Sequence, residues 1–187
     1  MELERIIWPG KISGTKIPSY IVPIRPHWST DLFDGRLATG RLWAADTELV
    51  LNPDSVYYRA PTPRVFHECG RILWYVSKGK TTGSKMLRAC SSLTAVQVGP
   101  PKDLFRRFRR LGVYDWKEAQ KTASSVTDRL MALEFTDTEL LTAPLGWTRL
   151  KATLKQHNLQ NHTFQWPLRI SDALFFDLYT AGTAHRQ

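Results

Sequence analysis

The residues of this chain best suited to chemistry are cations and aromatic rings that lie close together in the sequence. The run 71–79 is apolar and aromatic, and it ends in Ser77-Lys78-Gly79. The polar segment that follows brings three lysines into one short loop: Lys78, Lys80 and Lys85. Aromatic faces stack on nucleic-acid bases, and lysines attract phosphates. The stretch therefore predicts one wall of a concave site that takes a base or its backbone.

The candidate nucleic-acid-binding residues are aromatic side chains, a serine and cations from several predicted elements. They are Trp28, Tyr57, Tyr58, Arg59, Trp74, Tyr75, Ser77, Lys78, Lys80, Arg106, Arg107, Arg109 and Arg110. Each ring alone is more often part of a core than of a binding site. Neighbouring residues on a strand point to opposite faces, so at most one of Trp74 and Tyr75 can line a cleft. The four arginines form either a solvated helix face or a phosphate-binding ridge.

Other kinds of site find little support in the residue pattern. The five histidines are scattered without metal-ligand spacing, and two cysteines provide neither a zinc set nor a disulfide framework. Ser77 and Lys78 resemble a catalytic dyad, but adjacent strand residues point apart. The glycine-bearing loop 79–85 lacks the spacing of a phosphate-binding P-loop. We assign no catalytic residue, no metal and no cofactor.

Composition narrows the class of partner. The chain has 187 residues with 26 basic and 17 acidic side chains, a net charge of +9. This balance favours a polyanionic partner, RNA, DNA or an acidic protein. No apolar run approaches the roughly 20 residues of a membrane span, and the N-terminal residues lack the layout of a signal peptide. We expect a cytoplasmic protein with no membrane partner.

Hydrophobic periodicity predicts a mixed set of elements. Strands are expected at 20–24, 56–60, 71–76, 86–98 and 130–135, the last continued through 136–141 along an edge of the sheet. Helices are expected at 26–33, 102–111 and 147–156 and from the Ser171 cap to Gly182, whereas 117–129 fits a helix or a loop. Residues 1–19 form an N-terminal arm and 20–187 one domain. The expected class is α+β, a small mixed or antiparallel β-barrel with flanking helices.

Several segments resemble a known family. The stretch 24–35, Ile-Arg-Pro-His-Trp-Ser-Thr-Asp-Leu-Phe-Asp-Gly, is similar to the opening of ASCH domains, which belong to the PUA-like clan together with EVE and YTH domains. Later segments of the family are resembled, in the same order, by Val56-Tyr57-Tyr58-Arg59, 72–77, 89–99 and 144–150. The resemblance implies a PUA-like β-barrel that binds RNA or a modified base in a cleft.

The chain departs from the pattern of the ASCH enzymes that hydrolyse acylated cytidine. Their lysine and threonine positions correspond to Leu37 and Gly40 here, and their carboxylate to the region of Ser91, Ser92 and Leu93. We therefore favour a binding module over an enzyme. Two alternatives stay open: an amidohydrolase acting on a modified nucleoside, and a regulatory module that works with an acetyltransferase-type protein partner.

Overall fold

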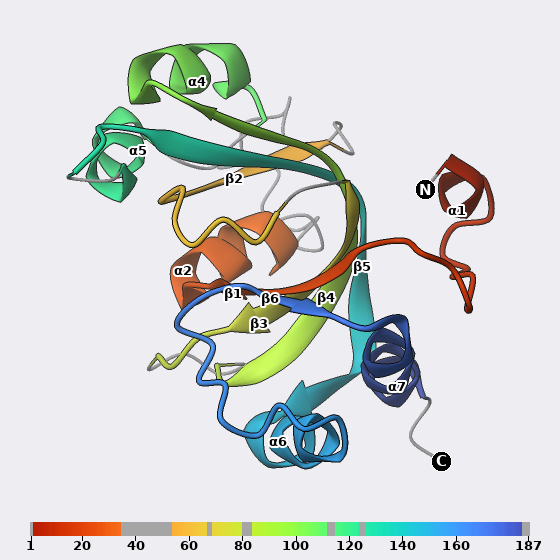
Figure 1. The fold of residues 1–187 in the computed structure, drawn as a ribbon. Coiled ribbons are helices and arrows are strands. Elements are labelled where there is room, and N and C mark those ends of the chain that lie inside the picture. The colour runs from red at the N-terminus through yellow and green to blue at the C-terminus, as the bar shows by residue number, and fades with distance from the viewer. Residues whose placement is uncertain are drawn as a thin grey trace.

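The centre of the fold is a six-stranded mixed sheet in the order β2-β5-β4-β3-β1-β6 (Figure 1). The computed structural model describes residues 2–34, 54–66, 69–79, 84–111, 115–123 and 126–184. The strands are β1 Ser19–Ile24, β2 Ser55–Arg59, β3 Gly70–Val76, β4 Met86–Gly99, β5 Leu130–Gly146 and β6 Leu168–Ile170. The helices are α1 Glu2–Ile6, α2 Pro26–Ser29, the π-helical turn η1 Thr30–Asp34, α4 Pro101–Phe108, α5 Trp116–Thr122, α6 Trp147–Gln156 and α7 Asp172–Thr183.

The α+β class is confirmed, but the predicted barrel is wrong because the sheet does not close. Its end strands are short: β2 has five residues and β6 has three. Pairing between β1 and β6 ends at Ile21, two residues before Pro23, which has no backbone N–H for a ladder. The register shifts in the long β4–β5 ladder are of the kind that bend a sheet. The result is a curved sheet whose two ends approach each other without pairing.

The predicted central hairpin is confirmed. β3 and β4 pair antiparallel, and all seven residues of β3 are buried, as a strand packed on both faces requires. β3 also pairs in parallel with β1, which places it inside the sheet. Residues 136–141 belong to β5 and pair with β4, whereas the β2 ladder ends at Phe135, so among the described residues this part of β5 lies along an edge of the sheet, as expected.

The helices differ from expectation mainly at their ends. The predicted helix 26–33 divides into α2 and η1, and 117–129 contains the short α5. The Ser171 cap is confirmed, since its hydroxyl accepts from Leu174 N at 3.2 Å. α7 does not end at Gly182: a Cβ there would lie 2.8 Å from Leu141 Cδ1, so the missing side chain permits close packing on the sheet. Within the described ranges, no helix is long and apolar enough to cross a membrane.

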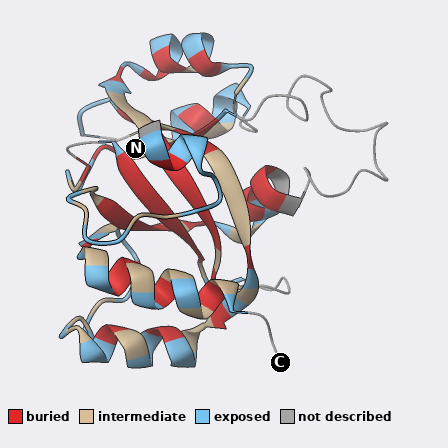
Figure 2. Ribbon diagram, turned by 90° about the vertical axis from the view of Figure 1, so that its right-hand side faces the viewer, coloured by how far each residue is buried: buried red, intermediate tan, exposed pale blue. Residues whose placement is uncertain are grey.

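Alternation along β3 separates two cores, one on each face of the sheet. Ile72, Trp74 and Val76 belong to the core beneath α2, η1 and α4, whereas Leu73 and Tyr75 belong to the core beneath α6 and α7. Figure 2 shows the buried strands in red between helices whose outer faces are exposed. Trp74 is fully buried, and its indole N–H donates to Ser91 Oγ at 2.8 Å.

Candidate nucleic-acid interface

A cleft of about 740 Å³ lies where the curved sheet fails to close. One side comes from β2, and the other from the end of β1, where β6 no longer covers the strand. The Tyr57 hydroxyl spans the gap and donates to Pro23 O at 3.4 Å. The lining residues are Pro23, Arg25, Trp28, Tyr57, Tyr58, Arg59, Ala60, Tyr75, Ser77, Lys78, Lys85, Lys121, Thr122, Trp147, Thr163, Phe164, Gln165 and Trp166.

Aromatic rings form much of this surface. Tyr75 packs against Phe164 at 4.7 Å and Trp147 at 6.1 Å between ring centroids. Most of the rings present only an edge, since Trp28 and Tyr75 are each 5% exposed. Trp166, at 54% exposure, is the ring most available for stacking on a planar group. The cleft therefore combines a packed aromatic base with one open indole at its rim.

The polar part of the lining is positively charged. Five cations line the cleft: Arg25, Arg59, Lys78, Lys85 and Lys121. Among the described lining residues there is no carboxylate and no histidine. Cations gathered without acidic partners create a positive potential that attracts anions such as phosphate groups.

Arg59, at the end of β2, contacts backbone carbonyls and a ring but no carboxylate among the described residues. Its Nε donates to Ala60 O at 3.1 Å and one terminal nitrogen to Thr62 O at 3.2 Å. The other terminal nitrogen is buried and has no hydrogen-bond partner among the described residues. The guanidinium lies 5.6 Å from the Phe66 ring centroid. Burial lowers the pKa of Arg59 to about 10, partly offset by the nearby Tyr57, so the side chain stays charged at neutral pH.

The described residues at the two ends of the lysine-bearing loop, 77–79 and 84–85, contact the ends of β1 and β3 and the start of α2. Ser77 N donates to Ile24 O at 2.9 Å, and Lys85 N donates to Val76 O at 2.8 Å. A Cβ at Gly79 would lie 2.5 Å from Pro26 Cγ, so only glycine allows this approach. Lys85 has a φ of 57°, a left-handed conformation that costs free energy in a residue with a side chain. These contacts position Lys78 and Lys85 at the mouth of the cleft.

The structure brings together seven of the thirteen residues singled out in the sequence. The residues that line the cleft are Trp28, Tyr57, Tyr58, Arg59, Tyr75, Ser77 and Lys78. Trp74 does not line it, because it is fully buried in the core that also contains Trp28, Tyr57 and Tyr58. Lys80 lies outside the described residues. The four arginines are exposed and do not line the cleft: Arg106 and Arg107 lie on α4, and Arg109 and Arg110 follow directly after its last residue.

Sequence reasoning missed the residues that come from distant loops and helix ends. Trp147 is the first residue of the helix expected at 147–156, and the candidate binding residues include neither Phe164 nor Trp166. The available signal was the presence of two aromatic residues, Phe164 and Trp166, in the mostly polar segment after α6. Lys121 and Arg25 carried no pattern of their own, and only the fold brings them to the cleft.

The described residues offer little for catalysis. Ser91, at the expected position of a catalytic carboxylate, is buried and bonded to Trp74 and to Thr138 Oγ1 at 2.8 Å. Both cysteines are free, and burial raises the pKa of the Cys90 thiol to about 12, which makes it unreactive. No cluster of metal-ligating side chains occurs in the part of the chain that is described. The amidohydrolase positions Leu37 and Gly40 lie outside that part.

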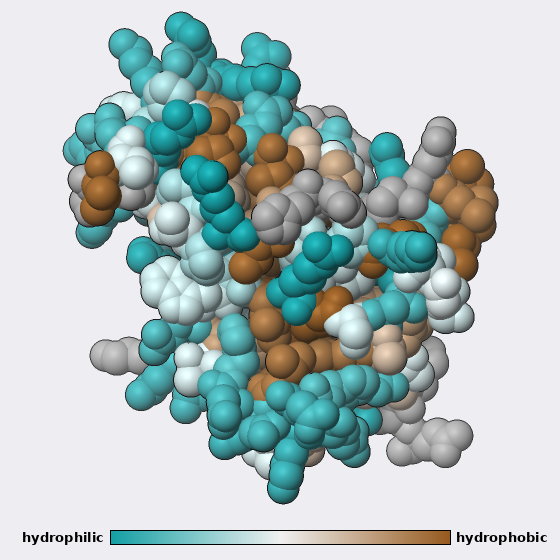
Figure 3. Space-filling view, in the orientation of Figure 1, coloured by the Kyte–Doolittle hydropathy of each residue, from teal (hydrophilic) through white to brown (hydrophobic). Residues whose placement is uncertain are grey.

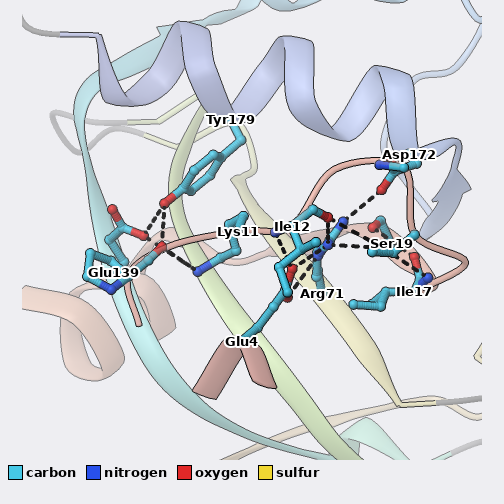
Figure 4. A network of polar contacts seen from close by, with 12 residues as sticks. Glu4, Lys11, Ile12, Ile17, Ser19, Arg71, Glu139, Asp172 and Tyr179 are labelled. Atoms are coloured by element: carbon cyan, nitrogen blue, oxygen red, sulfur yellow. Dashed lines mark hydrogen bonds and ion pairs between the residues drawn. The ribbon is translucent and has the colours of Figure 1, made fainter. Parts of the chain in front are cut away.

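A second buried arginine lies at the other end of β3 (Figure 4). Arg71 is 1% exposed and donates from Nε to Glu4 Oε2 at 3.0 Å and from NH1 to Asp172 Oδ1 at 2.9 Å. It also donates to Ile12 O at 2.7 Å and lies over the Phe175 ring. Burial alone would lower the pKa of Arg71, but the two carboxylates raise it above the ordinary value. The network ties the N-terminal segment and α7 to the sheet.

The fold is similar to that of solved ASCH structures, which confirms at the level of the fold the resemblance noted in the sequence. The ASCH protein of Zymomonas mobilis is 15% identical, with a TM-score of 0.59, and the match covers 86% of this chain and 92% of that one. A point mutant of the same protein matches at 15% identity and a TM-score of 0.60, over 89% of this chain and 96% of that one. No family model and no curated protein sequence matches the chain.

Proposed function

We propose that the cleft binds nucleic acid and accommodates a base of RNA or a modified base among its aromatic side chains. One observation carries the proposal: the described lining combines five cations and seven aromatic rings with no carboxylate. Its volume of about 740 Å³ falls within the range of about 300–1,000 Å³ typical of small-molecule sites. A nucleotide needs both halves of this chemistry, an apolar slot for the base and cations for the phosphate.

The forces suit a base that has left its helix or belongs to a single strand. Stacking on an aromatic side chain contributes about 1–3 kcal/mol per base. Extruding a base from a duplex costs a few kcal/mol, least where pairing is weak or absent. Trp166 offers the exposed face for stacking, and Lys78, Lys85 and Arg59 offer phosphate contacts. Single-stranded nucleic acid, or a duplex with an easily extruded modified base, is therefore the expected ligand.

Fluorescence polarisation with labelled single-stranded RNA, single-stranded DNA and duplexes with and without a modified cytosine tests the proposal. We expect binding that weakens steeply as salt rises, because phosphate contacts release counterions. The double variant Arg59→Gln/Lys78→Gln should lose most of this binding. Lys16→Gln/Arg169→Gln removes the same charge outside the cleft and should lose little. No measurable binding at low salt by the parent protein would refute the proposal.

Hydrolysis of a modified nucleoside is the alternative raised by the family resemblance. A general base must lie within hydrogen-bond reach of the proton it takes, and the described lining contains neither a carboxylate nor a histidine. Incubation with acylated cytidine, followed by mass analysis of the product, separates the two functions. Turnover would show that residues outside the described ranges complete a catalytic site.

The other alternative raised by the sequence is a regulatory module that binds a protein partner. This role concerns a surface other than the cleft. The apolar side chains of α1 and the turn after it are exposed: Leu3, Ile6, Ile7 and Trp8. A brown, hydrophobic surface lies over α1 in Figure 3. A pull-down of the parent protein and of an Ile6→Asp variant tests this role. Recovery of the same partner by both proteins would exclude this surface.

A further inference from the structure

A second, shallower groove of about 320 Å³ runs along the exposed face of α6. It is lined by Trp147, Thr148, Lys151, Ala152, Lys155 and Gln160. Trp147 lines this groove and the cleft alike, so the two depressions meet at one indole ring. In Figure 3 the surface over α6, at the bottom of the view, is hydrophilic.

The spacing of residues on α6 gives this groove its chemistry. Lys151 and Lys155 are four positions apart, so they lie on one face of the helix with Cβ atoms about 5–6 Å apart. Both are exposed, and no carboxylate occurs among the residues that line the groove. Ala152, between them, leaves the helix surface low, and lysine stems cover apolar surface while their ammonium groups reach solvent. The groove is therefore a narrow track with two cations in line.

Trp147 makes the connection structurally firm. Its ring lies 6.1 Å from Tyr75 and 6.1 Å from Phe164 between centroids, so the cleft aromatics hold it in place. It is also the first residue of α6, and the helix carries Lys151 one turn further on. A nucleic-acid strand that leaves the cleft across the Trp147 indole would pass Lys151 first and then Lys155.

We infer that a single nucleic-acid strand bound in the cleft continues across Trp147 and along α6, where Lys151 and Lys155 contact two successive parts of its phosphate backbone. The inference rests on the proposed function of the cleft and extends it: the ligand is a strand of several nucleotides and not an isolated nucleotide. The groove is one helix face wide, which suits a single backbone.

The arginine ridge on α4 is the rival path. Its members line neither groove. Arg106 forms an ion pair with Asp103 at 3.4 Å, and Arg107 lies over the Phe108 ring at 5.1 Å. These contacts partly satisfy the two side chains, and no shared residue joins the ridge to the cleft. Continuity with the cleft through Trp147 favours α6.

Binding of a 12-nucleotide and a 3-nucleotide mixed-sequence single strand, each as RNA and as DNA, tests the inference across a salt series. Each phosphate contact to a single strand contributes about 0.7 to the slope of log affinity against log salt. Lys151→Gln/Lys155→Gln should lower the slope for the 12-nucleotide strand by about 1.4 and leave the 3-nucleotide strand unchanged. Lys16→Gln/Arg169→Gln and Arg106→Gln/Arg107→Gln are the matched charge-removing controls.

The outcomes separate this inference from the proposed function. An unchanged slope for the long strand in the lysine variant overturns the path, as does an equal loss for both strands. A slope reduced by the α4 variant and not by the α6 variant places the path on the arginine ridge. In these cases, short-strand binding that is lost on Arg59→Gln keeps the proposed function intact. If the parent binds neither strand, both proposals fall.

Discussion

Two buried or half-buried arginines near opposite ends of the cleft-forming sheet have opposite surroundings. Arg71, at the start of β3, is paired with Glu4 and Asp172 and has a raised pKa. Arg59, beside the cleft, has backbone carbonyls and a ring for neighbours, one unsatisfied nitrogen and a lowered pKa. Arg71 holds segments of the fold together. Arg59 contacts no carboxylate among the described residues, and under the function proposed above its side chain binds an anion.

The comparison also explains where the cleft lies. At the Arg71 end, the N-terminal segment and α7 cover the sheet and supply the acidic partners. At the other end of β3, β6 stops early and the sheet ends separate, so aromatic and basic side chains face a gap. The incomplete closure of the sheet therefore opens the space that a nucleotide would fill. The predictions below start from the paired arginine and proceed to smaller effects.

Replacing the paired arginine should have the largest effect. Arg71→Met leaves Glu4 and Asp172 without their cation, and breaking a buried ion pair typically costs about 3–5 kcal/mol. We expect a loss of this size in the free energy of unfolding measured with urea. Glu4→Gln/Arg71→Met removes the stranded buried carboxylate as well and should recover part of the loss. An Arg71→Met variant as stable as the parent would contradict the role of the network.

Replacing Arg59 should have the opposite effect: a small change in stability and a large loss of nucleic-acid affinity. Arg59→Met removes a half-buried charge without stranding a carboxylate, so the free energy of unfolding should stay within about 1 kcal/mol of the parent. Affinity for single-stranded nucleic acid should fall about tenfold or more, since a hydrogen bond to a charged group contributes about 1.5–3 kcal/mol. Urea unfolding and fluorescence polarisation on the same preparation check both halves. A large loss of stability with full binding would reverse the comparison.

Replacing Trp166, the exposed ring that lines the cleft, should weaken nucleic-acid binding without changing stability. Trp166→Ala removes a stacking surface worth about 1–3 kcal/mol per base. Because the Trp166 side chain is exposed, the substitution leaves no buried cavity and should change the free energy of unfolding little. Trp8→Ala is the matched control, because Trp8 is 47% exposed against 54% for Trp166 and lies on the N-terminal segment. We expect weaker binding for Trp166→Ala and parental binding for Trp8→Ala. Equal affinities of the two variants would exclude Trp166 from the interface.

The smallest effect is a pH dependence of the Arg71 network. Burial alone would raise the pKa of Glu4, but the hydrogen bonds from Arg71 and Ile12 and the charges of Arg71 and Lys11 lower it below the ordinary value of 4.5. A carboxyl group with a lowered folded-state pKa stabilises the fold above its ordinary pKa, and this contribution is lost as pH falls through the folded value.

Unfolding measurements from about pH 6 down to about pH 3 should show the parent losing stability faster than Glu4→Gln. The variant starts from a lower stability and has no carboxyl at this position to protonate, so its curve should be flatter. Parallel curves for the two proteins would show that Glu4 gains no stability from its partners. Nucleic-acid binding at neutral pH should be unaffected in a folded Glu4→Gln variant.

Much of the local structure was predictable from the sequence because it depends on neighbours along the chain. The buried run of β3 and its hairpin with β4 follow from composition and turn residues, and the opposite faces of Trp74 and Tyr75 follow from strand geometry. The helix cap at Ser171 follows from a local side-chain contact. The barrel was a mistaken expectation because closure depends on how far two end strands extend and where their ladders stop, which no local pattern specifies.

The amino-acid sequence by itself determined that cations and aromatic rings are abundant near the β3–β4 hairpin, and that Trp74 and Tyr75 lie on opposite faces of β3. Only the tertiary structure decided which arginine is paired. The partners of Arg71 lie 67 and 101 positions away in the chain, and Trp166, Lys121 and Arg59 meet only around the open end of the sheet. Compensation of a buried charge depends on distances of a few ångströms, and chain folding sets those distances for residues far apart in sequence.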